Sequence, residues 1–158
     1  MCIVIDTCVI CSVFNKDSDN HRDYEPVHKW IIRGAGFMVY GGTKYLKEVK
    51  SIRRYLGIIV ELKNVGKVKE VDKSIVDCEE DIVKKLIPNG KCDDTHLIAI
   101  FRASGCKLLC SSDKKSDLYI KNSSLYNARQ DPPKIYRYRN HKRLLCPAYI
   151  VNIRNLSQ

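Results

Sequence analysis

Short apolar runs alternate with longer amphipathic stretches along this chain. The run 2–10 is short, apolar and rich in β-branched residues, which is typical of a buried strand, and four further short runs are predicted to be strands: 37–42, 68–73, 107–113 and 134–138. Between them, apolar residues recur at three- and four-residue steps, which predicts helices within 22–36, over 44–62 and 73–86, and within 91–105. Strands that alternate with helices predict an α/β fold, a three-layer α/β/α sandwich around a central, mainly parallel sheet of about five strands.

Polar residues mark the starts of the predicted helices. Thr43 is placed to cap the helix at 44–62, and Asp72 is placed to cap the helix at 73–86. In the acid pair that opens the last helix, Asp93 is the expected N-cap and Asp94 belongs to the first turn. Gly105 ends that helix.

One carboxylate, Asp6, interrupts the first apolar run, CIVIDTCVI. Burying an unpaired charge costs several kcal/mol or more, so Asp6 must meet a hydrogen-bond donor, a cation or solvent. In open parallel sheets the functional crevice lies outside the carboxyl ends of the strands. Asp6 and Asp113 both stand where a predicted strand ends, so we expect them at that crevice.

Two further acids extend this set. Glu48 lies about one turn into the helix at 44–62, and if that helix packs beside the first strand, Asp6, Glu48, Asp94 and Asp113 converge. Carboxylates gathered so closely repel one another, and a divalent cation relieves the repulsion. All-oxygen ligation is typical of Mg²⁺ or Mn²⁺ rather than zinc, and such sites suit phosphodiester hydrolysis. Taken singly, Asp93, Asp94 and Asp113 are better explained as structural helix caps, and only the set of four acids favours a metal site.

Four segments resemble the ordered acidic motifs of PIN-domain nucleases: VIDTCVI, TKYLKEV, DDTHLIAIFRASG and LLCSSD. The resemblance covers roughly residues 1–140. It implies a PIN-like nuclease domain at 1–145, with 146–158 as a C-terminal extension of the same domain. It also implies a metal-dependent endoribonuclease with Mg²⁺ or Mn²⁺ as cofactor. The catalytic and metal-binding residues would be Asp6, Glu48, Asp94 and Asp113.

The resemblance further implies a substrate of single-stranded or structured RNA, cleaved to leave a 5′ phosphate and a 3′ hydroxyl. Family members often act as toxins in toxin–antitoxin pairs or in RNA processing, so a protein antitoxin or inhibitor and a homodimer are open as further partners. Two other functions stay open. One is a non-catalytic PIN-like module that binds RNA or protein, and the other is a nuclease for single-stranded DNA.

The chain departs from the family pattern in places. Cys8 stands where the family usually has Asn or Ser after Asp-Thr. Asp93 is an alternative to Asp94 as the third metal ligand, and Asp117 is a further metal candidate or else a solvent-exposed helix start. The hydroxyls of Thr7 and Ser111 are expected to hold a metal-bound water or a ligating carboxylate, with ordinary turn hydrogen bonds as the alternative.

Composition narrows the class of protein. The 158 residues carry a net charge of +10, of which +2 falls on residues 1–90 and +8 on 91–158, and this favours a polyanionic partner. No apolar stretch approaches the roughly 20 residues of a membrane span. No secretory signal pattern opens the chain, so its eight cysteines predict a soluble protein of the reducing cytoplasm rather than a disulfide framework.

Several other motifs carry less weight. Cys8 and Cys11, like Cys106 and Cys110, lack the spacing of paired zinc hooks and are predicted to be small buried apolar residues. His96 is predicted to be a packed or half-exposed histidine rather than a ligand. The basic tail interleaves cations with tyrosines and either binds RNA or forms an edge strand with a solvated basic face: Lys134, Tyr136, Arg137, Tyr138, Arg139, Lys142, Arg143, Tyr149 and Arg154.

Overall fold

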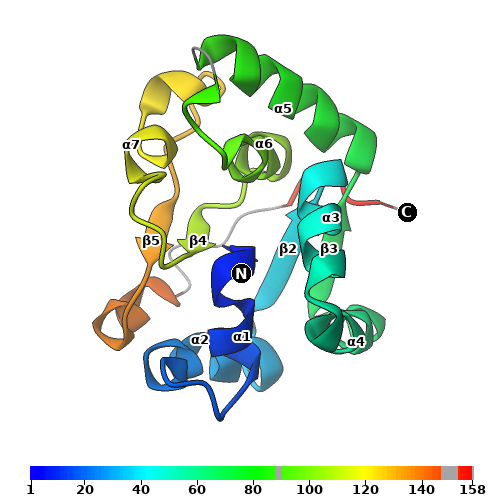
Figure 1. The fold of residues 1–158 in the computed structure, drawn as a ribbon, viewed down its shortest axis with the longest axis vertical. Coiled ribbons are helices and arrows are strands. Elements are labelled where there is room, and N and C mark those ends of the chain that lie inside the picture. The colour runs from blue at the N-terminus through cyan, green and yellow to red at the C-terminus, as the bar shows by residue number, and fades with distance from the viewer. Residues whose placement is uncertain (88–89, 147–152, 158) are drawn as a thin grey trace.

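A computed structural model describes residues 1–87, 90–146 and 153–157 of the chain (Figure 1). The strands are β1 (Cys2–Ile5), β2 (Phe37–Gly41), β3 (Val68–Val71), β4 (Leu108–Cys110) and β5 (Lys134–Tyr136). The helices are α1 (Ile10–Phe14), α2 (His21–Ile32), α3 (Thr43–Ser51), α4 (Arg53–Asn64), α5 (Lys73–Leu86), α6 (Thr95–Ser104) and α7 (Asp117–Ile120). Short 3₁₀ segments lie at Thr7–Val9, Ser123–Leu125 and Arg139–Leu144.

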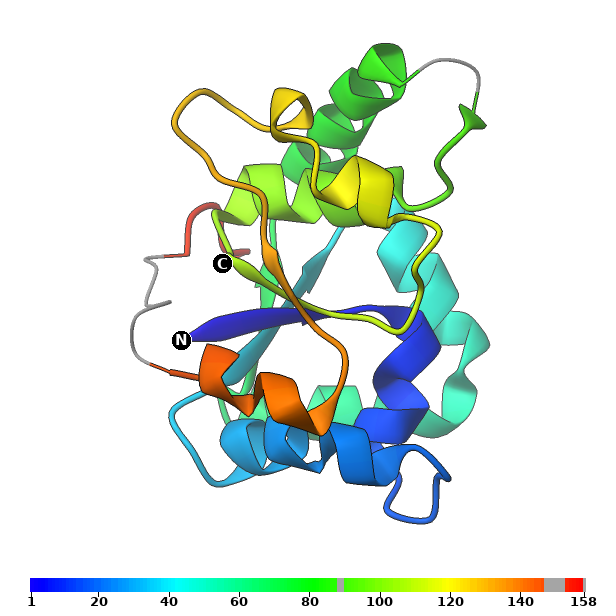
Figure 2. The same cartoon turned by 90° about the vertical axis from the view of Figure 1, so that its left-hand side faces the viewer.

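The five strands form one sheet in the order β3-β2-β1-β4-β5, and every neighbouring pair is parallel. Helices α5 and α6 cover one face of this sheet, and α2 and α4 cover the other (Figure 2). The predicted α/β/α sandwich with a central parallel sheet is therefore confirmed. The central strand β1 is apolar and buried along its whole length because helices cover both faces of the sheet.

The central position of β1 determines where its following residue lies. The Asp6 amide donates to the Cys110 carbonyl at 2.9 Å, which holds the end of β1 beside the end of β4. Both strands end at the same edge of the sheet because they are parallel. Residues that follow β1 and β4 therefore lie next to each other.

The first predicted strand is too long. Strand β1 ends at Ile5, and the apolar residues after Asp6 form a 3₁₀ turn and then α1. The Asp6 carboxylate accepts a hydrogen bond from the Cys8 amide at 3.2 Å, which turns the chain away from the sheet. Apolar composition alone does not distinguish a buried strand from a buried short helix.

The single helix predicted over 44–62 is also wrong, because the structure has two helices, α3 and α4, that meet at Ile52. Ile52 has a non-helical backbone with φ −97° and ψ 58°. The apolar three- and four-residue steps continue across this bend, so the sequence pattern does not reveal it. Gly42, rather than Thr43, is the N-cap, and its φ of 82° suits glycine. A Cβ there would come within 2.6 Å of Val76.

Of the other predicted helix ends, those at Asp72 and Gly105 are confirmed and the N-cap at Asp93 is wrong. Asp72 caps α5 through hydrogen bonds from the Ser74 and Ile75 amides, as predicted. Asp94, not Asp93, is the N-cap residue of α6, and its side chain makes no capping bond. Gly105 ends α6 in the left-handed conformation, as predicted.

The segment 153–157 returns to the sheet beside β3. Leu156 forms an antiparallel bridge with Val71, and the Ser157 amide donates to the Glu70 carbonyl at 2.9 Å. This contact covers part of an edge that would otherwise be open. Tyr149 of the predicted basic tail lies outside the described residues. Within the described parts of the chain, the helices are all too short or too polar to cross a bilayer.

Candidate functional site

Asp6 lies buried at the carboxyl edge of the sheet. Its side chain is 6% exposed and accepts hydrogen bonds from the Cys8 amide at 3.2 Å and the Ser111 hydroxyl at 2.7 Å. These two donors explain how a carboxylate can follow a buried strand without a direct ion pair. The charge in the opening apolar run is thus stabilised by turn and side-chain hydrogen bonds.

Ser111 links the first and fourth predicted acids. Its hydroxyl donates to Asp6 and accepts from the Asp113 amide at 3.1 Å. The Asp113 carboxylate accepts from the Lys115 amide at 2.7 Å, which shapes the turn after β4. Ser111 therefore binds the Asp6 carboxylate and also makes an ordinary turn hydrogen bond.

Helix α3 carries Glu48 to the same edge. The buried Tyr45 hydroxyl donates to the Ile5 carbonyl, which fixes α3 against the end of β1. One turn later, Glu48 accepts a hydrogen bond from the Thr7 hydroxyl at 2.9 Å. The helix thus packs beside the first strand, and Thr7 binds the Glu48 carboxylate.

The buried side chain of His96 lies beside Glu48. Its Nε2 lies 3.4 Å from a Glu48 carboxylate oxygen, yet neither ring nitrogen has a hydrogen-bond partner within the described residues. Burial opposes the charge of Glu48, but the interactions with His96 and Thr7 outweigh burial and lower the pKa of Glu48. His96 itself is 1% exposed, so the prediction of a packed histidine is confirmed.

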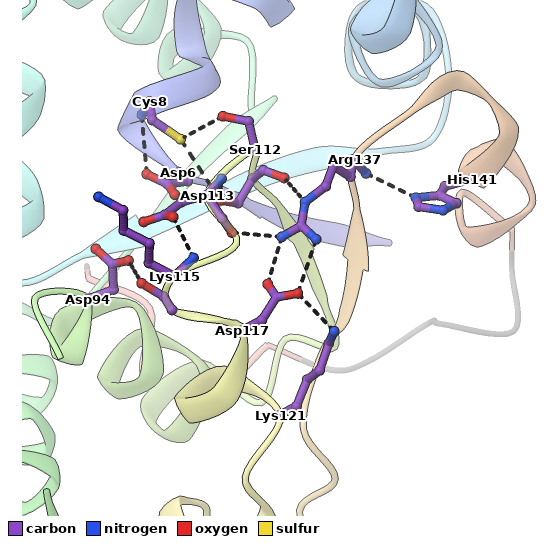
Figure 3. Close-up of polar contacts among 12 residues, drawn as sticks. Asp6, Cys8, Asp94, Ser112, Asp113, Lys115, Asp117, Lys121, Arg137 and His141 are labelled. Atoms are coloured by element: carbon purple, nitrogen blue, oxygen red, sulfur yellow. Dashed lines mark hydrogen bonds and ion pairs between the residues drawn. The ribbon is translucent and has the colours of Figure 1, made fainter. Parts of the chain in front are cut away.

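Asp94 faces the two acids that follow β1 and β4 (Figure 3). Burial raises the pKa of Asp94, and the negative charges of Asp6 and Asp113 raise it further. A hydrogen bond from the Ser116 hydroxyl acts in the opposite direction but does not cancel these effects. Asp94 is therefore a carboxylate under like-charge repulsion, which a simple helix cap would not be.

Asp93 lies on the exposed side of the same turn. Its backbone carbonyl accepts a hydrogen bond from the Lys44 ammonium of α3, and both residues line a cavity of about 330 Å³. Of the acid pair, Asp94 is the member whose charge interacts with Asp6 and Asp113.

The Asp117 carboxylate forms ion pairs with two cationic side chains. Arg137 donates to both of its carboxylate oxygens, at 2.7 and 3.1 Å, and Lys121 lies 2.9 Å away. The Arg137 hydrogen bonds hold the pKa of Asp117 below its ordinary value. Asp117 stands at the start of α7, so this geometry supports the structural alternative for it over metal ligation.

The four predicted acids reach one edge of the sheet without closing around a common point. Across the described parts of the chain, no three His, Cys, Asp or Glu side chains lie close enough to share a metal ion. The donor chemistry nevertheless fits a hard divalent cation, because Asp6, Asp94 and Asp113 offer carboxylate oxygens and repel one another. The arrangement differs from a formed metal site in spacing and not in donor type.

The cysteine prediction is only partly right. Cys106 and Cys110 are buried, as expected of small apolar residues, but Cys8 is exposed and Cys11 is half-buried. The Cys8 thiol lies 3.4 Å from the Ser112 hydroxyl, beside the Asp6 turn. The groups packed around the Cys8 sulfur partly desolvate it, and this desolvation and the charge of Asp6 raise the pKa of Cys8. Cys8 is therefore mainly a neutral thiol at pH 7.

Three side chains at this site were not expected from the sequence. Ser116 binds Asp94, and nothing in the sequence indicates that the turn after β4 reaches back to α6. The sequence pattern predicts that Arg137 binds RNA or lies on a solvated strand face, but this residue is 9% exposed and donates hydrogen bonds to Asp117. His96 stands in an otherwise apolar helix, THLIAIFRAS, and that setting was the available signal for its burial next to Glu48.

With this geometry described, comparison with known proteins adds no relative: no protein-family model, curated protein or solved structure matches the chain.

Proposed function

We propose that this protein is a metal-dependent endoribonuclease of the PIN type. The observation that carries the proposal is the meeting of Asp6, Asp94 and Asp113: burial raises the pKa of Asp94, and the charges of Asp6 and Asp113 raise it further. These carboxylates come from distant parts of the chain and lie at the carboxyl edge of a parallel sheet, where such folds bind ligands. Asp6 is buried, and Asp94 and Asp113 are half-buried, so their mutual repulsion is a cost to the fold unless a cation compensates it.

Asp6, Glu48, Asp94 and Asp113 are the residues that would hold Mg²⁺ or Mn²⁺. When bound, such an ion supplies an activated water and neutralises charge on the scissile phosphate, which accounts for a 5′ phosphate and a 3′ hydroxyl as products. The chain's own residues orient these ligands. Ser111 donates to one oxygen of the Asp6 carboxylate, and Thr7 donates to one oxygen of the Glu48 carboxylate. Each hydroxyl thereby orients a proposed ligand through one oxygen and does not bind the other.

The proposal requires the carboxylates to move closer together than they lie in this structure. Asp113 and Glu48 are half-exposed, and Asp113 follows a strand in a turn, so both side chains have room to change conformation. Asp94 would exchange its hydrogen bond with Ser116 for the ion. A structure determined with Mn²⁺ tests this step directly.

The finer parts of the proposal follow from the basic charge and the family resemblance. The substrate is single-stranded or structured RNA, since the net charge of +10 favours a polyanion. A toxin or defence role, a protein antitoxin or inhibitor, a homodimer and a cytoplasmic location belong to the same proposal.

The decisive experiment offers the full chain RNA and DNA single strands of one sequence, with Mg²⁺, Mn²⁺ or EDTA. We expect metal-dependent cleavage of the RNA. Loss of a residue that only orients a metal ligand lowers activity by about 10- to 100-fold. Asp6→Asn removes a proposed ligand itself, so it should lower the cleavage rate by about 100-fold or more. Asp19→Asn, which removes an exposed acid outside the predicted set of ligands, is the matched control. Unchanged cleavage by a folded Asp6→Asn protein would refute the proposal.

A non-catalytic RNA-binding or protein-interaction module is the second candidate. It is favoured by one observation, the absence within the described residues of three potential ligands close enough to share an ion. Melting temperature separates the two functions. A nuclease site should give a rise with Mn²⁺ beyond an ionic-strength control, whereas the module should show none.

A further inference from the structure

A basic cavity lies away from the carboxylates. It has a volume of about 440 Å³, within the range of small-ligand sites, and its polar lining comes from Arg102, Lys107, Asn127, Arg129, Gln130 and Arg154. No acid is among the lining residues. The lining is thus made of hydrogen-bond donors with a strong positive charge.

The charges of this cavity are unevenly compensated. Arg102 is bound to Glu79 at 2.5 Å and donates to the Leu125 carbonyl at 2.8 Å, so it forms a fixed wall. Lys107, Arg129 and Arg154 are exposed, and none forms an ion pair with a carboxylate in the described parts of the chain. Three unpaired cations around one hollow create a positive potential that attracts an anion.

The loop that carries Arg129 is tied to the end of α6. Gln130 donates to the Phe101 carbonyl at 2.6 Å, and Asn127 donates to the Arg102 carbonyl at 3.5 Å. Arg129 between them has a left-handed backbone with φ 67°. The Arg154 amide donates to the Ser104 carbonyl at 3.1 Å, which brings the C-terminal segment to the same place (Figure 2). Cations from three remote segments therefore meet on one scaffold.

The cavity is distinct from the candidate metal site. Asp94 stands at the N-terminal end of α6, and the cavity lies at the C-terminal end of that helix. At 1.5 Å per residue, the two ends of α6 are about 15 Å apart. Lys107 precedes β4, whereas Asp113 follows it, so the cavity lies at the opposite edge of the sheet.

We propose that this cavity binds a phosphate group of a phosphorylated ligand. Guanidinium groups recognise phosphate through paired, charge-assisted hydrogen bonds, and the cavity presents two free guanidinium groups and an ammonium. The phosphate belongs either to a free nucleotide or to an RNA backbone, since both present the same chemistry. The proposal does not depend on nuclease activity.

Calorimetric titration of the full chain at low salt in EDTA tests the proposal, with pyrophosphate, ADP and a short RNA as separate probes. We expect saturable binding of at least one probe. Arg129→Gln with Arg154→Gln should weaken it about tenfold or more, because two charged hydrogen-bond donors are lost. Arg22→Gln with Arg33→Gln removes two exposed arginines elsewhere and is the charge-matched control. Circular dichroism checks that both double variants fold. If the Arg129→Gln, Arg154→Gln protein does not fold, Lys107→Gln is tested in its place.

Each outcome decides the question. Binding of pyrophosphate and ADP identifies a free phosphorylated ligand, and binding of the RNA alone identifies a backbone phosphate. Absence of saturable binding for all three probes overturns the proposal. Equal weakening by the two double variants also overturns it, because it would mean that total charge alone attracts the anion. Because EDTA removes divalent ions, failure of the nuclease proposal would leave these results unchanged.

Discussion

Arg137 donates two hydrogen bonds to the Asp117 carboxylate, at 2.7 and 3.1 Å (Figure 3). The same guanidinium donates to the Ser111 carbonyl at 3.1 Å and to the Asp113 carbonyl at 2.7 Å. Arg137 therefore joins the end of β5, the start of α7 and the turn after β4. That turn carries Asp113, so a buried arginine fixes one of the proposed ligands through its backbone.

Replacing Arg137 with Met should destabilise the protein by about 2 kcal/mol, because a half-buried carboxylate and two carbonyls lose their donor. Urea denaturation measures this change. Lys121→Met is the control, since Lys121 binds the same carboxylate but is 60% exposed, and its loss should cost no more than about 0.5 kcal/mol. Equal losses for the two variants would mean that Arg137 contributes only surface charge.

The Asp117 pair should also make stability depend on pH. The Arg137 hydrogen bonds lower the pKa of Asp117 from its ordinary value of 3.8 in the folded protein. A lowered folded-state pKa stabilises the fold above the unfolded-state pKa, and this contribution is lost as the pH falls through the folded-state pKa. Asp117→Asn should therefore be less stable than the native chain at about pH 6, with the gap closing below about pH 3. Urea curves across this range measure the gap, and a gap that stays constant would contradict the assignment.

The sequence predicted the architecture well because strand and helix periodicities are local signals. The range 73–86 matches α5, and all five strands were located. Bends were missed because they preserve those periodicities. The apolar steps run through Ile52, and the apolar run of β1 continues past the turn that Asp6 makes.

The candidate site was predictable only in part. Strand exits indicated Asp6 and Asp113, since topology alone brings the residues after β1 and β4 together. Contacts between segments remote in the sequence were not predictable. Ser116 binding Asp94 and His96 approaching Glu48 depend on how helices are rotated and packed, and spacing does not encode this.

Asp94→Asn should stabilise the metal-free protein at pH 7. Burial and the charges of Asp6 and Asp113 raise the folded-state pKa of Asp94, so ionisation costs stability as the pH rises above the unfolded-state value. The neutral amide avoids this cost and still accepts from Ser116, which predicts a gain of about 0.5–1 kcal/mol in EDTA. The gain should vanish in acid, below about pH 3, where the native carboxyl is protonated.

If the proposed metal site is correct, the same variant should lose its advantage when Mn²⁺ is added, because it lacks one of the ligands that would hold the ion. Urea denaturation with EDTA and with Mn²⁺ measures both effects. Asp93→Asn is the control, and its exposed side chain should change stability by less than about 0.5 kcal/mol in either condition. An Asp94→Asn protein less stable than the native chain in EDTA would show that the repulsion is not significant.

Thr7→Val should weaken Mn²⁺ binding by about tenfold, because Thr7 is a positioning residue for Glu48. The substitution keeps the shape of the side chain and removes the hydroxyl that donates to the Glu48 carboxylate at 2.9 Å. That hydrogen bond contributes to the lowered pKa of Glu48, so carboxyl NMR of the metal-free chain should show a higher Glu48 pKa in the variant. A purely packing role for Thr7 would change neither quantity.

Thr7→Ser is the matched variant, because it restores the hydroxyl without the methyl group. It should recover both the Mn²⁺ affinity and the low Glu48 pKa, although it loses some packing. Binding is measured by electron paramagnetic resonance of free Mn²⁺, which does not require turnover. If Thr7→Ser binds Mn²⁺ as weakly as Thr7→Val, the methyl group and not the hydrogen bond supports the site. If both bind as tightly as the native chain, Glu48 reaches the ion without help from Thr7.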